Sequence, residues 1–287
     1  MDWSKAKSIF IVVFALLNIF LAVQIWMQSP GAGFSTTPEE VDKVRNFLNN
    51  SGIEVQTDIP DRVEYKNFLD VRGEPISQNV IKNQFFDEDE EIDIENYSDE
   101  YVDFSGETGR VIKKSDGRIV YESHRFRPPG NNLLTEKDAL KVFEDFHKQG
   151  LSIPDDARLT NIEEFQNNRF RIEYHQVYRR QRVDTSYITM VVGASGVESY
   201  EKYWVNPLGY SGGEYLVIPS TGALMRLVDY VAKGDEVVVT DISLSYYSEP
   251  ISAGQWQVAP VWAITIQDVG NLYLNAYTGE LEGYREY

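Results

Sequence analysis

Residues 186–204 read SYITMVVGASGVESYEKYW. Apolar and polar side chains alternate on both sides of the central segment Gly193-Ala194-Ser195-Gly196. Alternation with a period of two is typical of a strand, and a short glycine-bounded segment between two such runs is typical of a hairpin turn. The stretch therefore predicts two antiparallel strands, over residues 186–193 and 197–204, and with them an antiparallel sheet.

The same alternation recurs along the C-terminal half of the chain. It predicts further strands over residues 170–177, 237–246, 259–267, 272–277 and 280–287. The hairpin that begins at Gly196 has an echo in the one that begins at Gly279, since each places a tyrosine a few residues after the glycine. We therefore expect two similar units in tandem, and a hairpin at residues 116–121 could close a third copy.

Three helices are predicted, each with one apolar face. Pro38 stands at a favoured first helical position, and Glu40 completes a capping box with the residue three positions before it. A second capping box runs to Asp138. We expect helices between Thr37 and Gly52, between Thr135 and Gly150, and over residues 221–230. A hairpin in residues 116–121 would then follow the helix that begins at Pro38.

Helices followed by antiparallel strands predict an α+β fold. The expected architecture is a single N-terminal transmembrane helix followed by extracytoplasmic tandem helix-plus-antiparallel-sheet units. The corresponding division of the chain is a cytoplasmic tip (1–7), an anchor (8–27), a linker (28–38), a first α+β region (39–130) and two α+β units (131–210 and 211–287).

Composition excludes several classes of site. The chain of 287 residues has no cysteine, which excludes disulfides, Cys-ligated zinc, iron–sulfur clusters and thiol nucleophiles. Its formal net charge of −18 argues against binding nucleic acid and against lying flat on anionic lipid.

Residues 8–27 read SIFIVVFALLNIFLAVQIWM and contain no charge. A helix of this length spans ~30 Å, the hydrocarbon thickness of a bilayer. Lys5 and Lys7 precede it, so the positive-inside rule places the N-terminus in the cytoplasm and the bulk of the chain outside. A cleaved signal peptide is the alternative, but its apolar stretch is shorter and Ser29–Phe34 is a poor cleavage site.

The predicted anchor has one face of small and polar residues. Ser8, Ala15 and Ala22 recur every seven residues, and Asn18 lies on the same side. Small residues let two helices approach closely, and an amide in lipid seeks a hydrogen-bond partner. We expect these four residues to contact a partner helix, although such residues also occur in ordinary anchors.

No catalytic, cofactor or metal site is predicted. Residues 209–213 match Gly-x-Ser-x-Gly, but no histidine follows His175 and the predicted context is a glycine-rich loop rather than a strand–turn–helix. His124, His147 and His175 lack metal-ligand spacing, and His147 and His175 are expected to be structural or on the surface. Residues 87–95 (DEDEEIDIE) are expected to form a solvated loop, with divalent-cation binding as the alternative.

The opening residues 1–21 (MDWSKAKSIFIVVFALLNIFL) closely resemble the YycI (WalI) family of low-GC Gram-positive bacteria. The C-terminal segments PVWAI (260–264) and LYLNAYTGE (272–280) look like the ending of the same family. The resemblance covers essentially the whole chain. It also implies that the outer region is similar to the C-terminal domains of YycH.

The resemblance implies a function. Members are accessory regulators of the WalK–WalR (YycG–YycF) two-component system, which controls cell-wall metabolism, and they associate with YycH and with the sensor kinase WalK, partly through transmembrane helices. No enzyme activity, cofactor or catalytic residue is implied, and the sign of regulation differs within the family. An extracytoplasmic module that binds a cell-wall or peptide ligand is the alternative, favoured by a pocket lined with Tyr and Trp, and an envelope hydrolase comes third.

Overall fold

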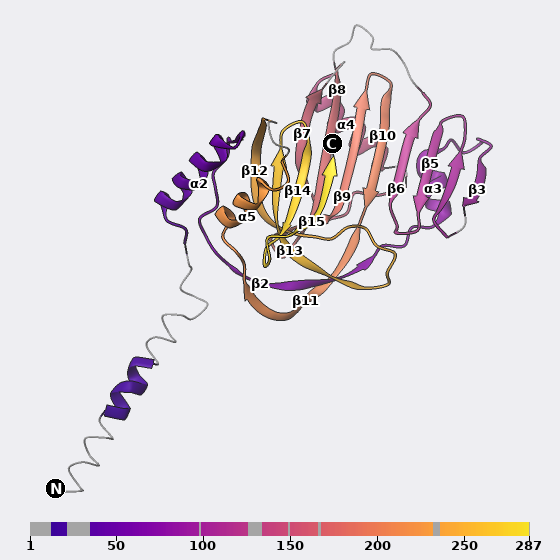
Figure 1. Cartoon of the computed structure of the whole chain (residues 1–287). Coiled ribbons are helices and arrows are strands. Elements are labelled where there is room, and N and C mark those ends of the chain that lie inside the picture. The colour runs from indigo at the N-terminus through magenta and orange to yellow at the C-terminus, as the bar shows by residue number, and fades with distance from the viewer. Residues whose placement is uncertain are drawn as a thin grey trace, which may run out of the picture.

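The computed structural model describes residues 13–21, 35–97, 99–125, 134–148, 150–165, 168–231 and 236–286. Residues 13–21 form a helix that lies apart from the folded body of the protein (Figure 1). No helix within the described residues is long and apolar enough to cross a membrane. Most of the predicted anchor, residues 8–27, lies outside the described residues, and so do residues 28–34 of the predicted linker.

The body consists of three units, each a helix followed by a four-stranded antiparallel meander. The first contains α3 (Gln78–Phe85), β3 (Asp93–Tyr97), β4 (Tyr101–Ser105), β5 (Gly109–Lys114) and β6 (Ile119–Ser123). The second contains α4 (Glu136–His147), β7 (Ala157–Phe165), β8 (Arg169–Tyr178), β9 (Gln181–Gly193) and β10 (Gly196–Tyr203). The third contains α5 (Ser220–Leu227), β12 (Val237–Tyr247), β13 (Trp256–Ile266), β14 (Gly270–Asn275) and β15 (Leu281–Glu286).

The first two units share one sheet, because β6 pairs with β10 antiparallel. Helices α3 and α4 cover the same face of this sheet. Phe85 of α3 and Phe143 of α4 join the buried core that Ile172 and Tyr200 contribute from the strands. Thr135 caps α4 through the predicted capping box with Asp138, whose backbone N–H lies 3.3 Å from the Thr135 hydroxyl.

The third unit takes in the helix predicted at Pro38. This helix, α2 (Pro38–Asn50), buries Leu48 in a core with Leu224 of α5, and β1 (Ile53–Val55) then pairs with β12 in parallel. The helix that precedes the hairpin at residues 116–121 is therefore α3, a segment with no predicted helix, and not the helix at Pro38. The apolar face of α2 packs on the core of the third unit, so α2 belongs to that unit and not to the unit that contains the hairpin.

Strands β2 (Tyr65–Gly73) and β11 (Val205–Leu216) form a ribbon that links the two sheets through β13. The glycine-rich loop predicted at residues 209–213 is wrong, because these residues lie within β11. The ribbon accommodates the glycines by two shifts in the pairing register with β2. One lies between Pro207 and Gly209, and the other lies between Ser211 and Tyr215.

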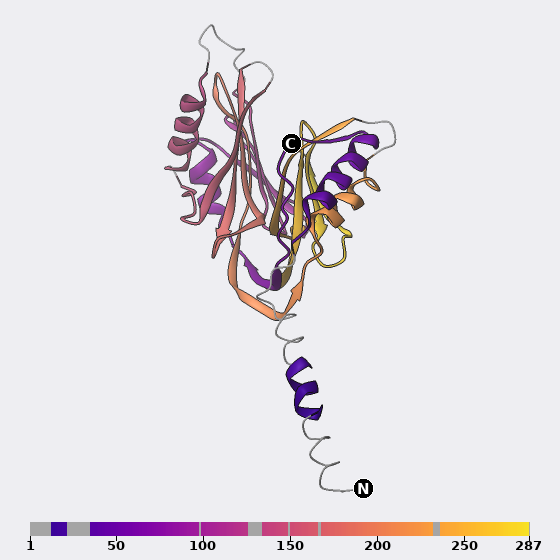
Figure 2. The ribbon, with the colours of Figure 1, turned by 90° about the vertical axis from the view of Figure 1, so that its left-hand side faces the viewer.

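The two sheets face each other, and the helices lie on the outside. Figure 2 shows α3 and α4 on one side of the body, α2 and α5 on the other, and the sheets between them. Among the described residues, the two sheets pair directly only where Ser245 and Tyr246 of β12 meet Arg182 and Val183 of β9. The protein is thus a mixed α+β fold, mostly sheet. The predicted division at residues 39–130, 131–210 and 211–287 stays a prediction about folding units.

Candidate functional site

The predicted helix-contact residues are only partly within the described structure. Ala15 and Asn18 lie in the exposed helix 13–21, whereas Ser8 and Ala22 lie outside the described residues. The side-chain amide of Asn18 donates a hydrogen bond to the carbonyl oxygen of Phe14, at 2.8 Å. One amide hydrogen is therefore satisfied within the helix, and the amide oxygen accepts no hydrogen bond from any of the described residues. Contact with a partner helix stays a prediction.

A polar cleft lies between the two sheets, at the point where β9 and β12 diverge. Its volume is about 540 Å³, within the usual range for small-molecule sites. The second unit supplies Thr160, Asn161, Glu163, Glu173, His175 and Arg182, and the third supplies Thr240, Asp241, Thr265, Gln267, Asp268 and Asn271. The lining contains no aliphatic residue, tyrosine or tryptophan, so it differs from the aromatic pocket that the ligand-binding alternative calls for.

The alternation of β8 explains how this cleft forms. Phe170, Ile172 and Tyr174 pack against the helix-covered core of the second unit. Glu173 and His175 have the opposite parity, so they point away from α4 and toward the third unit. The strand pattern thus places a charged face where a second sheet covers it.

His175 has a defined tautomer in this cleft. Its Nε2 lies 2.9 Å from Nη2 of Arg285, which can only donate, so Nε2 accepts. The proton is therefore on Nδ1, which donates to the Thr160 hydroxyl at 2.8 Å. Burial lowers the pKa of His175 to about 3, so it is neutral at physiological pH. A base that activates a hydroxyl would need the reverse hydrogen bond, so this pair is not built as a nucleophile.

Arg285 of β15 reaches from the third unit into the second. Its guanidinium carbon lies 4.4 Å from the ring centroid of Tyr187, and its Nη2 lies 3.9 Å from a carboxylate oxygen of Glu173. Glu173 is 3% exposed, and burial raises its pKa although Arg285 opposes the shift. The guanidinium thus connects β15 to β8 and β9 across the interface.

A second arginine neutralises the most deeply buried acid. Asp184 is fully buried, and its two carboxylate oxygens lie 2.7 Å from Nε and 2.9 Å from Nη2 of Arg182. Burial alone would raise the pKa of Asp184, but the arginine outweighs it and the pKa is lowered. Arg182 also lies 3.5 Å from Asp241 of β12, so it pairs acids of both sheets.

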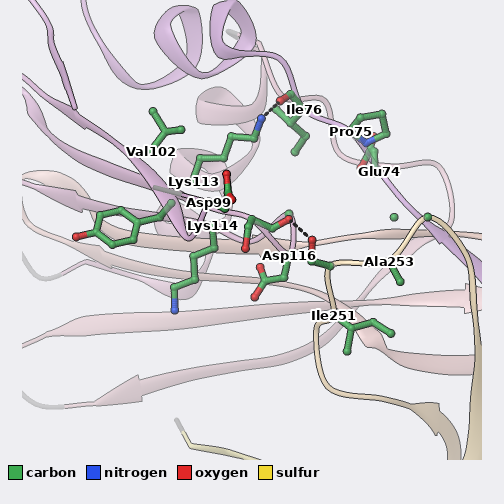
Figure 3. A pocket seen from close by; sticks show the side chains of 16 residues that line it. Glu74, Pro75, Ile76, Asp99, Val102, Lys113, Lys114, Asp116, Ile251 and Ala253 are labelled. Carbon is green, nitrogen blue, oxygen red and sulfur yellow. Dashed lines mark hydrogen bonds between the residues drawn. The ribbon is translucent and has the colours of Figure 1, made fainter. Parts of the chain in front are cut away.

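Another hollow lies at the end of the first unit, with a volume of about 480 Å³ (Figure 3). Figure 3 shows Lys113 and Lys114 pointing in opposite directions. The Lys113 ammonium donates to the carbonyl oxygen of Ile76 at 2.7 Å, and Asp116 pairs with Arg118 at 2.7 Å. Lys113 and Asp116 therefore already have partners within the hollow and its surroundings.

The remaining sequence motifs have structural partners. Ser211, the serine of the Gly-x-Ser-x-Gly match, donates to Asp70 at 2.8 Å and is not near a histidine partner. His147 donates from Nδ1 to the carbonyl oxygen of Phe143, and burial lowers its pKa to about 4. In the acidic segment, Glu90 accepts from the backbone N–H groups of Asp87 and Thr108.

Within the described residues, no group of three or more His, Cys, Asp or Glu side chains could hold a metal ion. Sequence reasoning missed the cleft entirely. The one signal for it was the alternation of Arg171, Glu173 and His175 with apolar residues, which by itself predicts a solvent-facing strand surface.

Comparisons with known proteins place the fold and the family. The crystal structure of an uncharacterized protein from Eubacterium rectale matches with a TM-score of 0.53 and 11% identity, over 85% of this chain and 99% of that one, which shows likeness of fold alone. YycH from Bacillus subtilis matches with a TM-score of 0.46 and 14% identity, over 79% of this chain and 58% of that one. That likeness is too low to carry an argument.

A search of the curated proteins finds no match. The family model described as YycI protein matches residues 33–277. This range includes all three helix-plus-meander units, apart from the last strand, β15. The chain therefore belongs to the YycI family, a family of accessory regulatory proteins.

Proposed function

We propose that this chain is a non-enzymatic, single-pass membrane regulator that modulates the sensor kinase WalK by protein–protein contact, together with YycH. The family match over residues 33–277 is the observation that carries the proposal. Residues 1–7 would lie in the cytoplasm, 8–27 in the bilayer, and the folded body outside, joined to the span by residues 28–38.

The exposed helix supports membrane anchoring. Its apolar side chains are half exposed or more in most cases, for example 67% for Phe14 and 61% for Ile19, and no part of the folded body covers them. An apolar helix without cover is costly in water, since each exposed CH₂ forgoes ~0.8 kcal/mol of burial. Lipid, or a partner helix within lipid, would supply that cover.

The face of Ala15 and Ala22 is where we propose that the partner helix docks. Asn18 lies on this face, and its amide oxygen is available to accept a hydrogen bond from the partner. Bulky side chains at Ala15 and Ala22 would keep two helices apart, whereas the same increase in apolar character on the opposite face would not.

The experiment is a pull-down of the full chain from membranes in mild detergent. Three forms are compared: the native chain, Ala15→Leu with Ala22→Leu, and a control with Val13→Phe and Leu17→Phe, which adds similar apolar bulk on the opposite face. We expect WalK and YycH to be recovered with the native chain and the control but lost with the alanine variant. Full recovery with the alanine variant would refute the helix face. Absence of WalK from the native pull-down would refute the proposed function.

A further inference from the structure

We propose that the two-residue turn between β8 and β9 docks on the phosphate groups of the bilayer that holds the anchor. The turn consists of Arg179 and Arg180. This inference rests on the single-pass anchor proposed above, and it adds a second contact between the chain and the membrane. It follows from the backbone of the turn, from the partners that its guanidinium groups lack, and from the end of the body at which the turn lies.

The backbone of this turn is unusual for arginine. Strands β8 and β9 stay paired up to the turn, so Arg179 and Arg180 alone connect them. Their φ angles are 47° and 69°, the pattern of a type I′ turn. Both central positions of such a turn favour asparagine and glycine, because a left-handed backbone brings a Cβ atom close to the following carbonyl oxygen. Two arginines therefore stand where they make the fold less stable, and residues of this kind cluster at functional sites.

Neither guanidinium has an acidic partner among the described residues. Arg179 and Arg180 are exposed, and their side chains form no ion pair or hydrogen bond within the described part of the chain. Arg179 lies over Tyr178 and Tyr210 instead, with its guanidinium carbon 5.2 and 5.9 Å from the two ring centroids. Stacking on a ring leaves the N–H groups of a guanidinium able to donate paired hydrogen bonds to a phosphate. In a chain with 45 acidic and 27 basic residues, two adjacent arginines without a carboxylate indicate a partner outside the chain.

The turn lies at the end of the body where the chain arrives from the anchor. Ser35 forms a β-bridge with Arg62, just before β2. Strand β2 runs beside β11, whose Tyr210 contacts the Arg179 guanidinium. Figures 1 and 2 both show this ribbon at the end of the body that faces the helix 13–21. The eight residues from the end of the predicted span to Ser35 reach at most ~28 Å, so this end of the body stays near the bilayer.

The ribbon beside the turn also exposes apolar side chains. Leu208, Tyr215 and Leu216 of β11 are 44%, 54% and 41% exposed. Tyrosine is enriched where a protein meets the headgroup region, and aliphatic side chains enter the boundary between headgroups and acyl chains. Arginines beside exposed tyrosine and leucine are therefore the combination that suits contact with a phospholipid surface.

The acidic charge of the whole chain does not prevent this local contact. At physiological ionic strength the screening length is ~8 Å, so more distant carboxylates have little effect on the turn. In the ribbon, Asp70 pairs in register with Gly209, and its carboxylate accepts a hydrogen bond from the Ser211 hydroxyl at 2.8 Å. The net charge thus opposes a body that lies flat on the membrane but allows contact through one basic tip. Lipid is favoured over an acidic protein, because the anchor already holds phosphates close to this end.

The test places single labels on the full chain in nanodiscs of phosphatidylcholine and phosphatidylglycerol. Because the chain has no cysteine, one introduced cysteine at a time can carry a fluorophore. Asn206→Cys, exposed on β11, reports on the ribbon, and Ala194→Cys reports on the opposite end of β9. Ile19→Cys reports on the anchor. Quenching by spin labels on lipid headgroups measures proximity to the membrane surface, and quenching by spin labels on acyl chains measures insertion.

We expect strong headgroup quenching at Asn206→Cys and little at Ala194→Cys. Arg179→Asn with Arg180→Gly installs the pair that a type I′ turn favours, so the Tm should be equal or higher. Headgroup quenching at the ribbon should nevertheless fall at least twofold, whereas a merely structural turn would leave it unchanged. In the native chain, raising the salt to about 1 M shortens the screening length to ~3 Å and should weaken the same quenching without any substitution.

Lys137→Gln with Lys141→Gln is the matched control. It removes the same charge from exposed positions on α4, and it should leave the ribbon quenched as in the native chain. Equal quenching at Asn206→Cys and Ala194→Cys, or an equal loss in both double variants, would overturn the inference. If Ile19→Cys is quenched from the acyl chains but the ribbon is not quenched from the headgroups, this inference fails and the anchor stands. If Ile19→Cys is not quenched, the proposed anchoring fails and this inference fails with it.

Discussion

Replacing Arg285 with methionine tests whether this one side chain holds the two sheets together. Methionine keeps most of the apolar volume of the arginine stem but removes the guanidinium. Three contacts are then lost: the hydrogen bond to His175, the ion pair with Glu173 and the stacking over Tyr187.

The magnitude follows from the groups left behind. A buried acceptor without a donor, here Nε2 of His175, costs ~1–3 kcal/mol. Breaking a buried ion pair by removing one partner costs ~3–5 kcal/mol when the remaining charge cannot adapt, but Glu173 can take up a proton. We therefore expect the free energy of unfolding to fall by about 3 kcal/mol at pH 8, with a decrease in Tm of roughly 6–12 °C for a body of this size.

The loss should depend on pH. Burial already raises the pKa of Glu173, and removing Arg285 removes the charge that opposes this shift. The stranded carboxylate of the variant therefore takes up a proton at a higher pH than the same group does in the native chain. Because protonation removes the penalty of the unpaired charge, the difference between variant and native chain should be smaller at pH 5 than at pH 8.

The assay is urea unfolding of the full chain in a mild non-ionic detergent, followed by the fluorescence of its five tryptophans. Arg226→Met is the control, because Arg226 is 61% exposed on α5 and its ion pair with Asp229 is long, at 4.0 Å. We expect the control to lie within ~0.5 kcal/mol of the native chain. A cost below ~1 kcal/mol for Arg285→Met at pH 8, or a cost that does not shrink at pH 5, would refute the reasoning.

Three further predictions concern stability. His175 has a pKa of about 3 in the folded state, whereas an unfolded histidine titrates near pH 6.5. Between these two pH values the unfolded chain binds more protons than the folded chain, so the free energy of unfolding falls as the pH falls. His175→Gln should reduce this pH dependence in urea unfolding by up to ~1.4 kcal/mol per pH unit, and an unchanged pH dependence would contradict the assignment. Gly270→Ala should lower the free energy of unfolding by more than ~2 kcal/mol, because φ is 145° and the new Cβ would lie 2.1 Å from the carbonyl oxygen of Arg285. Gly254→Ala is the control: a Cβ there would have nothing within 4 Å, so the same measurement should show almost no change. Thr135→Ala should lower the Tm through a loss of ~1 kcal/mol, since it removes the cap of α4; no change would mean that the capping box contributes nothing.

Much of the secondary structure was predictable because its signals are local. The cap at Thr135 acts on a residue three positions away, and the predicted helix there matches α4 closely. The hairpin at residues 186–204 also corresponds to β9 and β10, because alternation and a glycine-bounded turn are properties of a short stretch. The assignment to the YycI family is confirmed by the family match over residues 33–277.

Other elements could not be predicted because their signals are weak or misleading. Strand β11 contains Pro207 and three glycines, which indicate a loop, yet pairing with β2 holds it extended. Helix α3 has only eight residues, too few for a clear periodicity. Its stability comes from burying Ile81 and Phe85 in the core of the first unit, a tertiary effect that propensity does not report.

The sequence by itself determined which residues share a face of each strand and where helices begin, and its uncharged segment at residues 8–27 predicted the membrane anchor. Only the tertiary structure decided what each face meets. The alternation of β8 puts Glu173 and His175 on one side, and a polar side normally faces water. Here Arg285, more than one hundred residues later in the chain, crosses from the opposite sheet to meet them. Such a contact depends on how the two sheets pack, and no period in a single strand encodes it.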